Sequence, residues 1–276
     1  MKSKAWIPLL VVIVFALSLE MLAPRLYELF PRKLPPPPIE LARSYGGSGN
    51  DWARAIQQTT DGGYIVAAHT ESSDGDVTLN RGLSDYWVIK LNAQGGIVWQ
   101  KTYGGSGYDT AASIEQTPDG GYIVAGSSSS GGWASSSDGD VSGKRGITNY
   151  WIVKLDAEGK LLWQRPLGGS MMDQANSVQQ TTDGGYIVAG DSISKDGDVS
   201  GNRGNADYWI VKLNVRGKIV WQKTLGGSGS DIATSIQQTT DGGYIIAGHS
   251  DSKDGDVSGN HGGYDYWIVK LVGPEG

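Results

Sequence analysis

Four acidic loops with the spacing of calcium ligands recur along this 276-residue chain. The third of them, residues 196–207, has carboxylates at its first, third and twelfth positions and a serine hydroxyl at the fifth. Calcium takes about six to eight oxygen ligands, and alternate residues of an EF-hand-type loop supply them. Gly201, at the sixth position, allows the sharp turn of such a loop. The pattern predicts a Ca²⁺ site.

The other acidic loops, residues 74–85, 138–149 and 254–265, keep this pattern to different degrees. The second loop ends in Asn149, and the first has Leu79 where the glycine belongs, so the third and fourth loops are the best candidates. The predicted ligands are Asp196, Asp198, Ser200, Asn202 and Asp207; Asp254, Asp256, Ser258, Asn260 and Asp265; Asp138, Asp140 and Ser142; and Asp74, Asp76 and Asp85. The bidentate glutamate and the flanking helices of an EF-hand are missing. An alternative therefore stays open, in which these aspartates form turns with their own backbone.

A second set of aspartates ends a glycine-rich loop, Gly-Gly-Ser-Gly-x-Asp, in each repeat. These glycine loops are residues 46–51, 104–109, 168–173 and 226–231. A ring of their four aspartates could hold a cation, but we favour the interpretation that each aspartate stabilises its own glycine turn.

Both kinds of loop belong to a block that repeats four times, opening at Gly46, Gly104, Gly168 and Gly226. Each block holds four strand-like runs, which in the first block are residues 52–59, 64–70, 85–91 and 97–103. Asp61-Gly62 between the first two runs is a hairpin signal. Four antiparallel strands per repeat predict an all-β fold, a β-propeller.

The last block stops after its third run, at Leu271. Residues 39–46 align with the outer run 97–104 of the first block, with Leu41 in the place of Trp99. We therefore predict a four-bladed propeller whose last blade is closed by the N-terminal strand, and we expect a monomer.

Two resemblances support this fold. Residues 155–164, with Gly168 five positions after Trp163, look like the tryptophan-docking motif of quinoprotein-like propellers, in which the tryptophan packs on the next blade. The glycine loop followed by Asp-Gly-Gly-Tyr-Ile-Val-Ala-Gly resembles the SBBP-type repeats of bacterial and archaeal extracellular propellers. The likeness covers residues 39–271 and implies the fold only, because propellers carry many functions. It identifies no quinone-binding residue.

The N-terminus is expected to act in export. Lys2 and Lys4 precede the uncharged run 5–19, so residues 1–23 are predicted to form an N-terminal hydrophobic helix that acts as a signal peptide or a signal anchor. Residues 24–38, which end in four prolines, are a predicted linker, and residues 39–276 the propeller. Either outcome places the protein outside the cytoplasm, secreted or anchored to the membrane. The chain has no cysteine, so packing, ring closure or metal must stabilise it.

Charge and composition narrow the function. Residues 39–276 carry 18 basic and 27 acidic residues, a net charge of −9, which argues against nucleic-acid binding. The three histidines have no recognisable nucleophile partner, so an enzyme is the less favoured class. We expect a surface scaffold that binds a protein on the face formed by the acidic and glycine loops. The alternative is a carbohydrate-binding or carbohydrate-cleaving propeller that uses Trp133, in a six-residue insertion, or Trp52.

Overall fold

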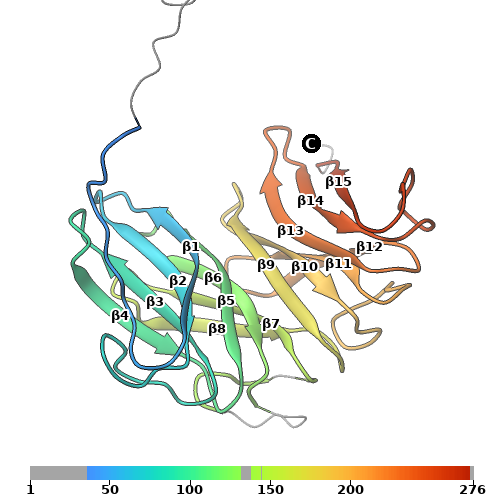
Figure 1. Ribbon diagram of the computed structural model, residues 1–276. Coiled ribbons are helices and arrows are strands. Elements are labelled where there is room, and N and C mark those ends of the chain that lie inside the picture. Colours follow the sequence, from blue (N-terminus) through green and yellow to red (C-terminus); the bar gives the residue numbers. More distant parts are fainter. Residues whose placement is uncertain (1–35, 132–137, 144, 274–276) are drawn as a thin grey trace, which may run out of the picture. The chain divides into compact units, whose positions relative to one another are not determined.

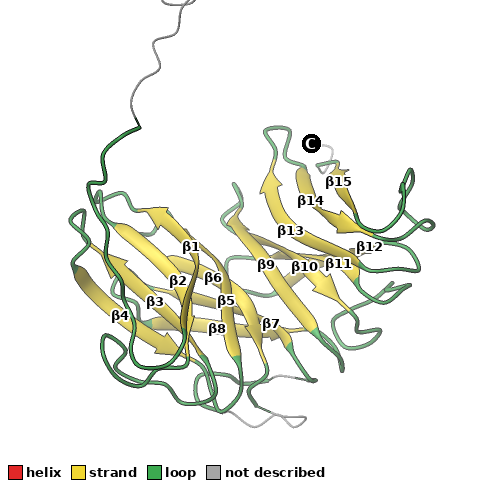
Figure 2. Ribbon diagram, in the orientation of Figure 1, coloured by secondary structure: helices red, strands yellow, loops and turns green. Residues whose placement is uncertain are grey.

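The computed structural model describes residues 36–131, 138–143 and 145–273. The chain divides into two units, residues 1–42 and residues 43–276. The predicted signal segment lies outside the described residues, as does the linker up to residue 35. Within the part that is described, every regular element is a strand, and no helix could cross a membrane (Figure 2).

Fifteen strands form four antiparallel sheets in the order of the sequence (Figure 1). The first sheet contains β1 (Asp51–Gln58), β2 (Tyr64–Thr70), β3 (Asp85–Leu91) and β4 (Ile97–Tyr103). The second contains β5 (Asp109–Gln116), β6 (Tyr122–Ser128), β7 (Asn149–Leu155) and β8 (Leu161–Leu167). The third contains β9 (Asp173–Gln180), β10 (Tyr186–Ser192), β11 (Asp207–Leu213) and β12 (Ile219–Leu225). The fourth contains β13 (Asp231–Gln238), β14 (Tyr244–Ser250) and β15 (Asp265–Leu271). Sheets of this kind are consistent with propeller blades, which confirms the predicted all-β repeat.

The Asp-Gly-Gly turns are structural, as the sequence indicates. Between β1 and β2, the N–H of Gly62 donates to the carbonyl of Thr59, and Gly62 takes a φ of 81°, in the left-handed region that favours glycine. The carboxylate of Asp61 accepts the N–H of Gly63. The turn therefore satisfies its own backbone and carries its aspartate at one edge of the sheet.

The third strand of each of the first three sheets is buried on both faces, as its apolar pattern predicts. Its tyrosine reaches across to the next sheet. The Tyr86 hydroxyl donates to the carbonyl of Trp151 at 2.9 Å, and the two rings lie 4.6 Å apart. Tyr150 and Trp209 repeat this contact between the second and third sheets, and Tyr208 and Trp267 between the third and fourth. We call these three contacts between successive sheets the first, second and third junctions.

The predicted tryptophan docking is also present. The indole N–H of Trp99, on β4, donates to the carbonyl of Ala157 in the β7–β8 turn of the next sheet at 3.1 Å. Its ring packs edge-on against Tyr122 at 5.8 Å. The outer strand of one sheet is thus fixed to the next sheet along the chain.

The fourth sheet has three strands where the others have four. Residues 36–50 form no strand, so the predicted pairing of residues 39–46 with this sheet is not part of the described fold. Tyr45 instead donates its hydroxyl to the carbonyl of Gly95 in the β3–β4 turn at 2.5 Å. The edge of β15 consequently has no neighbour among the described strands.

Candidate functional site

The first and third aspartates of each acidic loop hold the preceding glycine loop. Asp196 accepts the N–H of Ser170 at 2.7 Å, and Asp198 accepts the N–H of Gly168 at 3.3 Å. The same two bonds occur in the other repeats, made by Asp74 and Asp76, Asp138 and Asp140, and Asp254 and Asp256. These carboxylates therefore act as acceptors for loop backbone.

The remaining predicted ligands point to different partners. Ser200 bonds to Gln222 on the outer strand β12, as Ser142 bonds to Gln164. Asn202 donates to the carbonyl of Ser192 on β10 at 2.5 Å. The twelfth residue of three loops accepts a backbone N–H of its own loop. Asp85 accepts the N–H of Arg81, Asp207 that of Arg203, and Asp265 that of His261.

The predicted calcium ligands thus bond to four different parts of the fold, which are the glycine loop, the outer strand, the second strand and the acidic loop itself. Among the residues that the structure describes, no group of three acidic or histidine side chains could hold a metal ion. The arrangement resembles the alternative that the sequence left open, in which the aspartates organise backbone. Calcium binding stays a prediction.

Ion pairs join successive acidic loops. Arg81 in the first loop meets Asp140 in the second at 2.8 Å, and Arg203 in the third meets Asp256 in the fourth at 3.0 Å. Arg145 lies 3.6 Å from Asp198. These pairs are partly exposed, so each contributes only a few tenths of a kcal/mol up to about 1 kcal/mol. They extend along the face formed by the two kinds of loop.

Two buried aspartates meet at the first junction. A side chain on Gly104 would collide with the carboxylates of both Asp85 and Asp109, so glycine is required there. The pKa of Asp85 is raised to about 6, mainly by burial; the charge of Asp109 contributes to the rise, and the hydrogen bond from the Arg81 N–H opposes it. One oxygen of each carboxylate, Oδ1, has no hydrogen-bond partner. Burial and the neighbouring like charge both disfavour the ionised form of Asp85.

At the second junction an asparagine replaces one of the two aspartates, which removes the repulsion between two carboxylates. Asn149 stands where the first junction has Asp85, and its amide donates to Asp173 at 3.1 Å and to the carbonyl of Gly169. The third junction returns to two aspartates, Asp207 and Asp231, and burial raises the pKa of Asp207. The glycine-loop aspartates also accept their own glycine N–H groups, as Asp109 does from Gly105 at 2.8 Å. The turn-stabilising interpretation of these residues is therefore confirmed.

A buried lysine in each of the first three sheets was not singled out from the sequence. Lys90, Lys154 and Lys212 are nearly inaccessible, and their ammonium groups bond to the exposed turn aspartates Asp61, Asp119 and Asp183. Each ammonium group also donates to the carbonyl of the following leucine. The signal was present, since a lysine interrupts the apolar strand before its last leucine in every repeat.

Exposed apolar side chains gather on the loops of the first two junctions. Leu83 bonds through its N–H to the carbonyl of Gly107, which places it beside the exposed Tyr108. At the second junction the exposed Ile147 precedes Thr148, whose N–H bonds to the carbonyl of Met171. The third junction has Asn205 and Ser230 at the positions of Ile147 and Met172. The apolar pattern is thus confined to two of three equivalent places.

The two tryptophans singled out from the sequence have different outcomes. Trp52, at the start of β1, is exposed and lies against His69, with ring centroids 5.0 Å apart. Trp133 lies outside the described residues. A polar cavity of about 330 Å³, which Trp52 does not line, lies among the strands β1, β5, β6 and β9. Its polar lining residues are Arg54, Thr110, Ser127, Gln174 and Asn176.

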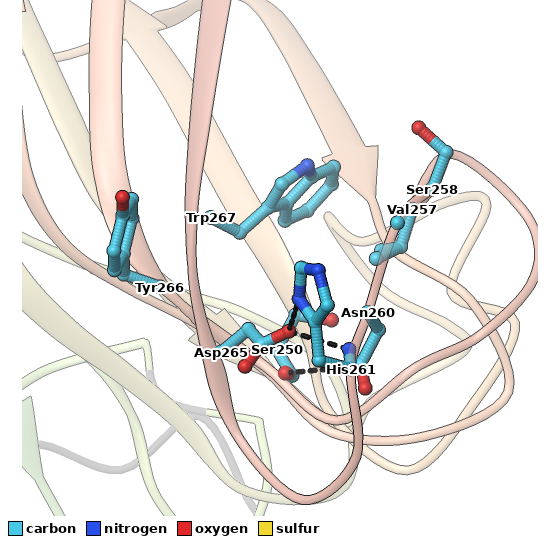
Figure 3. Close-up of a pocket in the computed structure, with 9 residues that line it drawn as sticks. Ser250, Val257, Ser258, Asn260, His261, Asp265, Tyr266 and Trp267 are labelled. Carbon is cyan, nitrogen blue, oxygen red and sulfur yellow. Dashed lines mark hydrogen bonds and ion pairs between the residues drawn. The ribbon is translucent and has the colours of Figure 1, made fainter.

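A second hollow, of about 240 Å³, lies on the fourth sheet and its acidic loop (Figure 3). Val257 and Ser258 face Trp267 across it, and the imidazole of His261 lies 2.9 Å from Asp265. Among the described residues no nucleophile bonds to His261, so this histidine and aspartate do not form a catalytic triad. Ser258, Asn260 and Asp265 are predicted calcium ligands that line this hollow.

Comparisons with known proteins give a distant likeness in fold. No protein-family model matches the chain, and no curated protein is similar to it in sequence. Similar solved structures include an ACO/RPE65 chimera, with a TM-score of 0.38, 15% identity and coverage of 80% of this chain and 47% of that one. A mutant of the Synechocystis apocarotenoid oxygenase has a TM-score of 0.38 and 15% identity, with coverage of 79% of this chain and 47% of that one. BamB from Moraxella catarrhalis has a TM-score of 0.26 and 13% identity, with coverage of 70% of this chain and 54% of that one. The chain spans about half the length of these structures.

Proposed function

We propose that this chain is an extracytoplasmic β-propeller scaffold that binds a protein partner through the loops of its first two junctions. The basic, then apolar, start of the sequence supports export, either by a cleaved signal peptide or by a membrane anchor. A strand from residues 39–46 completes the fourth sheet, because an unpaired strand edge would otherwise stay open.

The observation that carries this proposal is the uneven distribution of exposed apolar side chains. Leu83 and Tyr108 are exposed at the first junction, and Ile147, Met171 and Met172 at the second. Aromatic residues and methionine are enriched in protein interfaces, and contiguous exposed apolar groups mark such sites. The equivalent places of the third junction are small or polar, so the fold itself does not require apolar residues there.

A site-specific photo-cross-linker tests this proposal in the native host. A benzophenone amino acid is placed at Tyr108, at Ile147 and, as the matched control, at Ser230, the third-junction equivalent of Tyr108. We expect Tyr108 and Ile147 to capture the same protein and Ser230 to capture none. Binding of that purified protein should fall at least about tenfold in Tyr108→Glu and stay within about twofold in Ser230→Glu. Equal capture from all three positions would contradict the proposal.

Trp52 supports the alternative, a carbohydrate-binding propeller. Its ring is exposed beside His69 and could stack on a sugar. A glycan-array signal that Trp52→Ala abolishes, while the Tyr108→Glu variant keeps it, would favour this function over protein binding.

A further inference from the structure

The first sheet exposes residues that the three junctions bury. Ile56 on β1 is 66% exposed, whereas its equivalents on the inner strands of the other sheets are 5–7% exposed. Those equivalents are Ile114, Val178 and Ile236. The difference arises because β5, β9 and β13 each have a preceding sheet packed on them, and β1 has none among the described strands.

The fourth sheet has the complementary deficit. Tyr266 is 85% exposed, while Tyr86, Tyr150 and Tyr208 at the same position are fully buried and reach a tryptophan carbonyl on the next sheet. Ile268, two residues on, is 57% exposed. The fourth sheet therefore exposes the tyrosine side of a junction. The first sheet exposes the surface on which such a tyrosine packs at the three junctions.

The hollow on the fourth sheet marks the place of a missing outer strand (Figure 3). In the third sheet the indole N–H of Trp209 donates to Gln222 of β12 at 2.9 Å, and Gln222 also bonds to Ser200. Their equivalents in the fourth sheet, Trp267 and Ser258, both line the hollow instead. An outer strand would fill it.

Residues 43–46 are placed as the end of such a strand. The hydroxyl of Tyr45 bonds to the carbonyl of Gly95, as that of Tyr103, at the end of β4, bonds to Gly159 in the next sheet. The N–H of Gly46 bonds to Asp76, as that of Gly104 bonds to Asp140. The chain thus enters its first sheet as if it came from a preceding sheet.

The regular step between sheets decides which sheet that is. The tyrosine and tryptophan rings lie 4.6, 4.5 and 4.7 Å apart at the three junctions, so each step repeats the one before. After three such steps β13–β15 have no packed contact with β1–β3. A fourth step of the same kind therefore reaches no described sheet of the same molecule, and the first sheet of a second copy has the exposed surface that fits this step. Propellers have about four to eight blades, a range that two copies meet and three exceed.

We propose that two copies of this chain join head to tail into one eight-bladed ring, in which residues 39–45 of each copy form the outer strand of the partner's fourth sheet. This inference rests on the pairing of residues 39–46 with the fourth sheet given under the proposed function. Tyr266 of one copy packs on the first sheet of the other, and the exchange occurs twice, so that the ring closes.

The joining surfaces also depart from the internal junctions. Ala68 stands where Gly126, Gly190 and Gly248 leave room for the tyrosine hydroxyl of the preceding sheet. Ala42 replaces the glutamine that bonds to the indole N–H, and Leu41 replaces the docking tryptophan. The Tyr266 hydroxyl must shift to pass the methyl group of Ala68, so Ala68→Gly should tighten the dimer.

Engineered cysteines test the exchange, because the chain has none of its own. The register of the other sheets, Gln100 opposite Ile89 and Gln222 opposite Val211, places Ala42 opposite Val269. Opposed residues of antiparallel strands have Cα atoms about 4.5–5.5 Å apart, within disulfide range. Full-length Ala42→Cys and Val269→Cys chains, mixed in detergent and oxidised, should give a covalent dimer that contains one of each. Ala42→Cys mixed with Val215→Cys is the control and should give none.

The double variant Ala42→Cys/Val269→Cys separates the two ways of failing. A covalent dimer supports exchange between copies. A monomer with an internal disulfide keeps the strand pairing but overturns the second copy, because the chain then closes on itself. No disulfide in folded protein overturns the pairing as well.

A mass measurement gives an independent readout. The protein mass in the detergent complex should be about twice 29.3 kDa and fall to one copy in Ile56→Glu. Val98→Glu is the matched control, since Val98 and its equivalents Leu162 and Val220 are exposed in every complete sheet. A wild-type mass of one copy would overturn the inference.

Discussion

The hydroxyl of Tyr150 donates a hydrogen bond to the backbone carbonyl of Trp209 at 2.8 Å, across the second junction. Tyr86 and Tyr208 make the same bond at the junctions on either side. In each of the first three sheets this tyrosine therefore links its sheet to the backbone of the next, beside a tryptophan ring of that sheet. Buried polar groups of this kind are costly to leave without a partner.

Tyr150→Phe should lower the free energy of unfolding by about 0.5–1.5 kcal/mol, because it removes the buried hydrogen bond to the carbonyl of Trp209. Tyr108→Phe, which removes an exposed hydroxyl, should change it by less than about 0.5 kcal/mol. Urea unfolding followed by tryptophan fluorescence measures both. Equal stability of the two variants would show that the bond across the junction contributes nothing.

Asp85→Asn should stabilise the protein near neutral pH by about 1–2 kcal/mol. Burial raises the pKa of Asp85 to about 6, above its unfolded value, so the folded state binds this proton more tightly. The stability that this group supports is present below pH 4 and is lost as the pH rises through about 6. The substitution copies Asn149, which bonds to Asp173 at the second junction.

Urea unfolding of Asp85→Asn and wild type at pH 5 and pH 8, in chelator-treated buffer, checks this sign. The advantage of the variant should be larger at pH 8. As a control, Asp76→Asn alters an exposed loop aspartate and should show no such pH-dependent gain. An advantage that is larger at pH 5 would contradict the raised pKa.

Lys212→Met should move the titration of Asp183 upward. Although partial burial raises the pKa of Asp183, the hydrogen bonds from Lys212, Thr181 and Gly185 outweigh it and lower the pKa to about 2. The stability linked to this carboxylate is present above pH 4 and is lost as the pH falls through about 2. NMR titration of the Asp183 carboxyl carbon should show its midpoint rising toward 4 in Lys212→Met and staying low in Lys218→Met, which changes an exposed lysine.

Asp196→Asn distinguishes the backbone role of the acidic loops from the predicted calcium role. Asparagine keeps an oxygen that can accept the N–H of Ser170, so this variant should lose less than about 1 kcal/mol, whereas Asp196→Ala should lose about 1–2 kcal/mol. Thermal melts are recorded with calcium and with a chelator. A calcium-dependent rise in Tm that Asp196→Asn removes would instead establish the metal site, because calcium needs the charged ligand.

The regular part of the fold could be read from the sequence because its causes are local. Alternating and doubly apolar runs predict the strands, Asp61-Gly62 predicts the turn, and the four copies of the block predict four sheets. A residue's neighbours within a hairpin are a few positions away, so propensity and hairpin chemistry suffice there.

The chain itself thus specified its strands, its turns and the docking of Trp99 on the next sheet. Only the tertiary structure decided where the acidic side chains go, since Asp196 meets Ser170 and Asp85 meets Asp109 across some two dozen residues. Spacing alone allows those oxygens to converge on an ion or to separate toward backbone donors, and packing between sheets selects the second. The same packing leaves Ile56 exposed on the first sheet and Tyr266 exposed on the fourth. The angle between successive sheets depends on how whole sheets pack together, so no local sequence pattern predicts it.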